Sequence, residues 1–196
     1  MLADVPFALT MEAVRAAPAP VLLSQIQSWV QASDPVCLVH PHGFFVVLLR
    51  RSGSEDWRFH WWPKGPRTYT GMPATIHTHD KVVESRIIAG QLTNVTYEVT
   101  EGATEGRPLY EVAYRGDKFS GTATNILQKT AKRVKFEIMS TQIHGVGDNY
   151  RVESHAYHEA IVSDDCVTAT IVCMHSPKPG AIKVVGLEGY PDLIEF

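Results

Sequence analysis

The pattern of apolar and polar positions divides the chain into a helical beginning and a long run of short strands. In residues 1–35, Thr10 is placed to cap the helix MEAVRAA, and the break at Pro18-Ala-Pro20 starts a second segment, VLLSQIQSWVQA. The apolar side chains of that segment recur at helical spacing and share one face: Leu22, Ile26, Trp29 and Val30. We expect an N-terminal helical cap that covers one side of a β-sheet, with a dimerisation helix as the alternative.

From Val36 onward the apolar segments become short, and proline and glycine residues separate them. The expected strands are 37–40, 44–51, 57–63, 74–78, 84–88, 92–99, 108–114, 133–139, 149–162 and 166–174, with a helical or looped piece near 122–128. No helix regularly separates these strands, which favours an antiparallel sandwich or barrel over a parallel α/β sheet. We therefore predict a mostly β fold, a double-sheet jelly roll.

The length of 196 residues suits one domain with a substantial core. We expect residues 1–196 to form this single domain, with the helical cap over 1–35, a β-barrel over 36–175 and a C-terminal extension over 176–196. The extension contains a last short strand, AIKVVG, and an acidic, partly apolar end, EGYPDLIEF. We expect it to lie across the outside of the barrel.

Charge and composition exclude some functions. A formal net charge of −3 without a basic stretch argues against nucleic-acid binding. The longest apolar run, Phe44 to Leu49, is too short to span a bilayer, and no targeting signal begins the chain, so we expect a cytoplasmic protein without a membrane partner. The three cysteines show no metal-binding spacing, and the sequon at Asn94 carries little weight without a secretory signal.

Candidate chemistry begins in the stretch from Gly71 to Gly90, GMPATIHTHDKVVESRIIAG. His77 and His79 are separated by one residue in a segment with strand character, so their side chains lie on the same face and can share one small cation. The spacing of these histidines between the flanking glycines resembles the first signature motif of the cupin superfamily. The resemblance covers roughly residues 40 to 175, and it implies the same jelly-roll architecture and a mononuclear metal site.

In cupins, a histidine of a second motif supplies the third metal ligand, and the stretch from Tyr150 to Met174 fits that motif. His155 and His158 compete for this role, and they lie on opposite strand faces because their separation is odd. The face of His158 carries small or apolar residues that suit a barrel interior, whereas charged residues accompany His155. We assign His158 as the ligand and keep His155 as the alternative, although Val162 stands where cupins often have Asn.

A fourth, acidic ligand is an open question at this point. Glu84 lies at one common distance within the cupin motif, and Val83 lies at the other, so strand alternation decides which of the two points inward. With Val83 inward, the site has three histidines and resembles that of the thiol dioxygenases, which hold Fe(II). With Glu84 inward, it resembles the cupins that hold Mn(II), Fe(II), Ni(II) or Zn(II) on three histidines and a glutamate. We favour the three-histidine site.

Groups that orient a substrate are the next candidates. An anionic substrate would favour an arginine, for which Arg86 and Arg58 are available, with a solvent-exposed salt-bridged arginine as the alternative for each. Tyr150 is predicted to share the inward face of His158 and could supply a hydroxyl. In the segment WRFHWW, alternation directs Trp57, Phe59 and Trp61 to one side and Arg58, His60 and Trp62 to the other.

The resemblance implies an Fe(II)- and dioxygen-dependent oxygenase that acts on a small molecule, with oxidation of a thiol to a sulfinate as the first reaction to test. Another divalent transition metal could occupy the same ligands. The alternatives are a redox-neutral cupin isomerase or lyase and a non-catalytic ligand-binding cupin. The expected partners are the substrate and dioxygen, together with a second copy of the chain in a homodimer.

Overall fold

The computed structural model describes residues 4–116 and 123–196. Over these ranges the chain forms two helices, α1 (Met11–Ala16) and α2 (Ala19–Ser33), followed by strands. The strands are β1 (Cys37–His40), β2 (Phe44–Ser52), β3 (Glu55–Trp62), β4 (Val82–Ala89), β5 (Leu92–Glu101), β6 (Arg107–Arg115), β7 (Thr124–His144), β8 (Asn149–Val152), β9 (Tyr157–Ile161), β10 (Thr168–His175), β11 (Ile182–Val185) and β12 (Leu193–Glu195).

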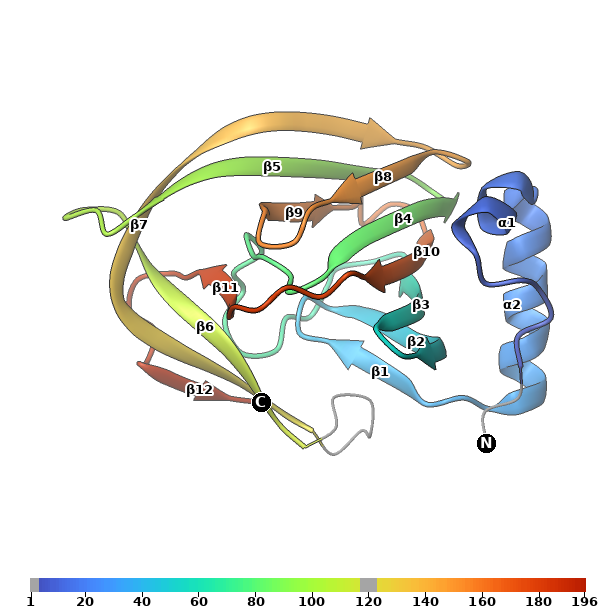
Figure 1. Cartoon of the computed structure of the whole chain (residues 1–196), viewed down its shortest axis with the longest axis horizontal. Coiled ribbons are helices and arrows are strands. Elements are labelled where there is room, and N and C mark those ends of the chain that lie inside the picture. The colour runs from blue at the N-terminus through green and yellow to red at the C-terminus, as the bar shows by residue number, and fades with distance from the viewer. Residues whose placement is uncertain (1–3, 117–122) are drawn as a thin grey trace.

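The strands form two antiparallel sheets that face each other (Figure 1). The first sheet has the order β1-β2-β3-β10-β4-β8, and the second has the order β11-β6-β7-β5-β9, with β12 on β7. Chain neighbours such as β3 and β4 are separated in the sheet by β10, which arrives from the other end of the sequence. This is the mostly β, double-sheet jelly roll that the sequence predicts.

The N-terminal helices cover the outer face of the first sheet, which confirms the expected helical cap (Figure 1). Thr10 caps α1, because its hydroxyl oxygen accepts a hydrogen bond from the Ala13 amide at 3.1 Å. Leu22 and Ile26 of α2 are almost fully buried in a cluster with residues from β2, β3, β4 and β10. The cap therefore covers apolar sheet surface that water would otherwise reach.

Side-chain alternation on β3 follows the prediction. Trp57 and Phe59 pack outward against the helical cap. His60 and Trp62 point into the barrel, where both rings contact Phe44. Alternation thus places the inward series of β3, which begins with Arg58, toward the interior that carries the histidines.

Two glycines shape the segment that precedes β4 and the turn that follows it. Gly71 has φ +75°, and a Cβ there would lie 2.7 Å from the Phe196 ring. Gly90 has φ +68°, and a Cβ there would lie 2.2 Å from the Val167 carbonyl oxygen. Both positions thus require glycine for conformation and for space. Residues 74–78 are extended but form isolated bridges through His77 instead of the predicted regular strand.

β7 differs from the prediction most clearly. A helical or looped piece was expected near 122–128, yet the chain is already in β7 at Thr124; residue 122 lies outside the described ranges. β7 pairs with β6 through Val134 and with β5 from there to His144. Over residues 135–144, β5 is the one described strand that pairs with β7, so the other edge of β7 is open there.

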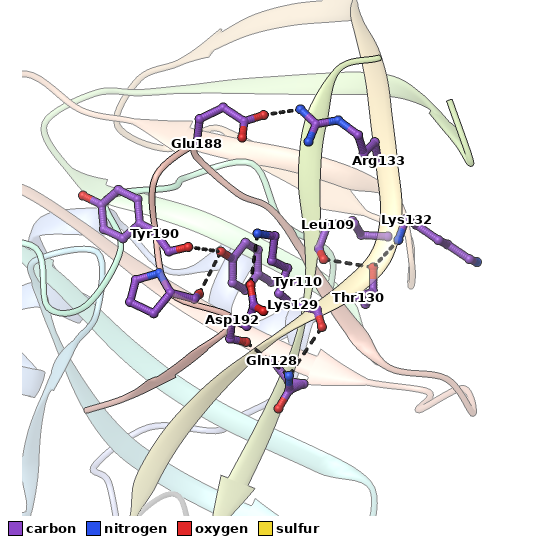
Figure 2. A network of polar contacts seen from close by, with 11 residues as sticks. Leu109, Tyr110, Gln128, Lys129, Thr130, Lys132, Arg133, Glu188, Tyr190 and Asp192 are labelled. Carbon is purple, nitrogen blue, oxygen red and sulfur yellow. Dashed lines mark hydrogen bonds and ion pairs between the residues drawn. The ribbon is translucent and has the colours of Figure 1, made fainter. Parts of the chain in front are cut away.

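The C-terminal extension is part of the second sheet, which corrects the expectation that it lies across the outside of the barrel. β11 pairs with β6, and β12 pairs with β7. Figure 2 shows the chain between them tied to β6 and β7: the Tyr110 hydroxyl donates to the Pro191 carbonyl oxygen at 3.0 Å, and Lys129 pairs with Asp192 at 3.1 Å. An ion pair between Arg133 and Glu188 adds to this attachment. The sequence EGYPDLIEF thus supplies polar anchors as well as a strand.

Among the described residues, neither helix is long and apolar enough to cross a membrane. Cys37, Cys166 and Cys173 are free thiols, of which Cys173 is buried in the core beneath the helical cap.

Candidate metal centre

Three histidines from two distant parts of the chain converge between the sheets. His77 and His79 lie in the extended segment before β4, and His158 lies on β9. The backbones of His77 and His158 are joined by two hydrogen bonds, of 3.0 and 2.9 Å, which fix their side chains next to each other. One ring nitrogen from each histidine lies within 4.8 Å of the other two, and the Nε2 atoms of His79 and His158 are 2.9 Å apart.

Neighbouring oxygen atoms orient two of the rings. The Nδ1 of His158 lies 2.9 Å from the side-chain oxygen of Asn94, and the Nδ1 of His77 lies 2.7 Å from the Thr75 carbonyl oxygen. Because both oxygens are acceptors, each Nδ1 carries the proton, and each Nε2 keeps a lone pair. Metal-binding histidines in proteins usually donate the hydrogen of the second ring nitrogen to an oxygen atom in this way.

Thr75, Glu159 and Tyr97 form a hydrogen-bond network beside His77. Thr75 donates its hydroxyl hydrogen to Glu159 at 2.6 Å, and Tyr97 donates to the other oxygen of that carboxylate. These contacts hold the backbone whose carbonyl orients His77. The orientation of His77 is therefore supported from outside the site.

The residues present fit a divalent transition metal. Imidazole nitrogens bind such metals at about 2.0–2.1 Å, so two Nε2 atoms 2.9 Å apart can reach one cation. Burial lowers the pKa values of all three histidines, with further lowering by neighbouring histidines for His79 and His158. They are therefore neutral near pH 7, which is the form that binds metal.

Glu84 does not belong to this group. Strand alternation on β4 turns Val83 inward, into a cluster with Val152 and Met174, while Glu84 faces the other side. There the Glu84 carboxylate pairs with Arg151 at 2.6 Å and with Arg15 at 3.2 Å. Among the described residues, the group that could hold a metal consists of the three histidines and contains no carboxylate.

His155 also lies away from the site. It occupies the turn before β9 with φ +63°, and its Nε2 is 3.1 Å from the Pro179 carbonyl oxygen. The structure thus brings His158, and not His155, to His77 and His79.

A cavity of about 360 Å³ opens beside the histidines. Its walls are mostly apolar, and its polar members come from several elements: His40, His42, Arg58, Thr70, His77, Thr78, His79, Asp80, Tyr114 and Asn125. Arg58 is paired with Asp56 at 3.3 Å, and the Arg58 side chain is 13% exposed. The mainly apolar wall of the cavity thus contains two of the metal-binding histidines and the guanidinium of Arg58.

Arg86 lies outside this cavity, contrary to the sequence-based expectation. It is on the outer face of β4, where its guanidinium donates to the backbone carbonyls of Arg15 and Ala17 at the end of α1. Side chains two residues apart on a strand lie on the same face. Arg86 therefore lies with Glu84 on the face of β4 that the helices cover.

Tyr150 points into the barrel as expected but does not line the cavity. It packs with Ile87 and Leu92 and stacks on the His144 ring at 5.1 Å between centroids. Burial raises the pKa of its phenol, which is therefore neutral. Tyr150 lies on β8 of the first sheet, whereas His158 lies on β9 of the second. The two residues therefore do not belong to one strand, as the sequence-based argument assumed.

Sequence reasoning missed His40 and His42. They line the same cavity, and the His42 ring lies 5.0 Å from the His77 ring between centroids. The signal was present, because CLVHPHG contains a second pair of histidines separated by one residue. Asn94 was also missed as a site residue; it is 3% exposed inside the barrel and holds His158.

Comparison with known proteins adds structural similarities of low identity. No protein-family model and no curated protein matches the sequence. The DMSP lyase DddQ from Ruegeria pomeroyi DSS-3 is 14% identical, with a TM-score of 0.47 over 90% of this chain and 70% of that one. An RmlC-like cupin from Shewanella frigidimarina NCIMB 400 is 13% identical, with a TM-score of 0.40 over 72% of this chain and 83% of that one.

KdgF from Halomonas sp. is 10% identical, with a TM-score of 0.37 over 71% of this chain and 85% of that one. The assignment of the fold rests on the strand order and pairing described above.

Proposed function

We propose that this protein is a mononuclear metal enzyme that holds Fe(II) on His77, His79 and His158 and uses dioxygen to oxidise a small anionic molecule. The observation that carries the proposal is the convergence of three neutral imidazoles, one buried and two half-buried, with two of them oriented through Nδ1 and no carboxylate among the described residues of the group.

The charge of the ligand set supports an anionic substrate. Three neutral imidazoles leave the full dipositive charge of a bound ion uncompensated, so a negatively charged group of the substrate is attracted to it. Arg58 adds a second positive charge in the wall of the same cavity, although Asp56 and the cavity-lining Asp80 partly offset it. Apolar side chains form most of the remaining wall and exclude water around a bound molecule.

Bound Fe(II) would supply the redox chemistry with dioxygen, and the chain would bind and orient the substrate. Thiols are the first substrate class to test. In that reaction a thiol R–SH and dioxygen give a sulfinic acid R–SO2H: both oxygen atoms enter the product, sulfur loses four electrons and dioxygen gains four. The reaction needs no other reductant.

The decisive experiment measures metal and oxygen together. Protein purified without added metal is analysed for bound elements, then stripped, loaded anaerobically with Fe(II) and given a panel of small thiols with and without a carboxylate. We expect near-stoichiometric iron, thiol-dependent oxygen consumption and a product that gains two oxygen atoms by mass spectrometry.

Two variants serve as a matched pair. His158→Ala should lose tight metal binding and activity, while His155→Ala should retain most of both because its ring lies outside the site. Stoichiometric metal in His158→Ala would contradict the ligand assignment. Oxygen consumption with other anions would keep the oxygenase and discard thiols, and turnover without oxygen would favour a redox-neutral lyase or isomerase.

A further inference from the structure

His40 is held in one orientation at the wall of the cavity. It is the last residue of β1, and its ring stacks on Phe44 with 4.2 Å between centroids and 18° between planes. The His42 ring meets it edge-on at 4.9 Å. With Phe44 against one face and His42 at its edge, the imidazole is confined to a small range of rotation.

The backbone also fixes the tautomer of His40. The His42 amide donates a hydrogen bond to the Nδ1 of His40 at 3.2 Å, so that nitrogen presents a lone pair. Burial lowers the pKa of His40 well below its usual value, and the neighbouring His42, His77, His60 and Arg58 lower it further. The ring is therefore neutral, and its single hydrogen is on Nε2.

The Nε2 hydrogen of His40 has no protein acceptor among the described residues. The Nε2 atom of His40 is not fully buried, and the residue lines the cavity. A neutral imidazole whose N–H faces a cavity is a hydrogen-bond donor that does not depend on pH across the neutral range.

His40 lies near both the metal-binding group and Arg58. On one side, His42 contacts His77 of the metal-binding group. On the other side, Arg58 is close enough to act electrostatically on His40. His40, Arg58 and two of the metal-binding histidines thus line one cavity, and a molecule bound there lies within reach of more than one of them.

We propose that His40 is a substrate-positioning residue whose Nε2–H donates a hydrogen bond to an oxygen acceptor, a carboxylate or carbonyl oxygen, of a molecule with a mainly apolar body. The proposal rests on the proposed function in that the ligand occupies the same cavity. It adds a specific donor that is neither a metal ligand nor a titrating group.

Two substitutions separate the donor from the contact that holds the ring. His40→Asn places a side-chain oxygen near the position of Nδ1, so the His42 amide keeps an acceptor while the distal donor is lost. His40→Gln places an amide N–H near the position of Nε2 and gives up the Nδ1 acceptor. Butyrate, a carboxylate with an apolar body, is titrated calorimetrically into the full chain loaded with redox-inert Zn(II).

We expect His40→Asn to weaken butyrate binding about tenfold or more and His40→Gln to weaken it less than about threefold. Side-chain nitrogen NMR of the wild type should also show His40 as the neutral Nε2–H tautomer. Equal loss in both variants, no loss in either, no butyrate binding by the wild type, or an Nδ1–H tautomer would overturn the proposal. Failure of the oxygenase alone would leave butyrate binding and its dependence on His40 intact.

Discussion

Asn94 shows how much of the metal centre depends on a residue that would touch no metal. Its side-chain oxygen accepts the Nδ1 hydrogen of His158 at 2.9 Å inside the barrel. Replacing this acceptor leaves the histidine free to rotate and to take the other tautomer.

We expect Asn94→Leu to lower metal affinity about 10–100-fold, because outer contacts of this kind have that effect on metal-binding histidines. Asn94→Asp should bind metal nearly as well as the wild type, since a carboxylate oxygen accepts the same hydrogen bond. Competition with a chromophoric chelator measures the affinities. Equal affinities for wild type and Asn94→Leu would show that the rest of the pocket is sufficient to orient His158.

Part of this residue-level picture follows from the sequence. Alternation brings His77 and His79 to one face, and the same rule selects His158 and Val83 over His155 and Glu84. Alternation holds only within a strand, however. Residues 153–156 lie outside β8 and β9, so alternation does not carry from Tyr150 to His158, and Tyr150 points inward but does not line the cavity.

At the scale of elements, Arg86 joins the helical cap to the barrel. Its guanidinium provides donors for the carbonyls of Arg15 and Ala17, which the short helix α1 leaves without partners in the helix. The Arg86 side chain is thus a structural clamp between α1 and β4.

We predict that Arg86→Gln lowers the free energy of unfolding by about 1.5–3 kcal/mol, the usual range for lost hydrogen bonds to a charged group. Metal stoichiometry should not change, because Arg86 is remote from the histidines. Arg115→Gln is the control, since its ion pair with Glu195 is exposed and should contribute little. Urea denaturation measures both; reduced metal binding by Arg86→Gln would contradict the assignment.

Helices and strands were predicted best where a strong hydrophobic period or a turn residue is present in the sequence. The helical cap, β2, β3 and the Gly90 turn follow from local patterns. So does β11, which lies within the expected strand AIKVVG. The beginning of β7 and the strand β12 do not, because their stability comes from pairing with β6 and β7 and from anchors such as Tyr110. Contacts between residues distant in the sequence are not visible in a local pattern.

At the scale of the whole molecule, histidines concentrated in the interior make the stability depend on pH. Burial lowers the pKa values of His42 and His60 to about 3, with electrostatic contributions from His77 and from Arg58 respectively. The unfolded chain takes up protons at these residues below about pH 6.5, and the folded protein does not.

We therefore expect metal-free protein to lose stability as the pH falls from about 6.5 toward 3, by about 1.4 kcal/mol per pH unit for each such histidine. His60→Phe should lose less stability between pH 7.5 and 5.5 than the wild type does. Urea midpoints at the two pH values provide the test. A variant with the same pH dependence as the wild type would exclude His60 as a source of the effect.

The open edge of β7 makes the molecule a template for further strand pairing. Ile138 and Ile143 on this edge are 66% and 63% exposed, and no charged residue lies between them. Antiparallel pairing of this edge with the same edge of a partner subunit would cover Ile138 and Ile143 of both copies. A closed pair of copies would also protect an edge that otherwise invites aggregation.

We accordingly expect a homodimer through residues 135–144, which sedimentation velocity would detect. Ile143→Lys should shift it to monomer, while Val21→Lys, on the similarly exposed surface of α2, should not. A monomeric wild type at high concentration would exclude this interface. In such a dimer, the second sheets of two copies would form one continuous sheet between two three-histidine sites, so each half of the assembly would carry its own cavity on a shared scaffold.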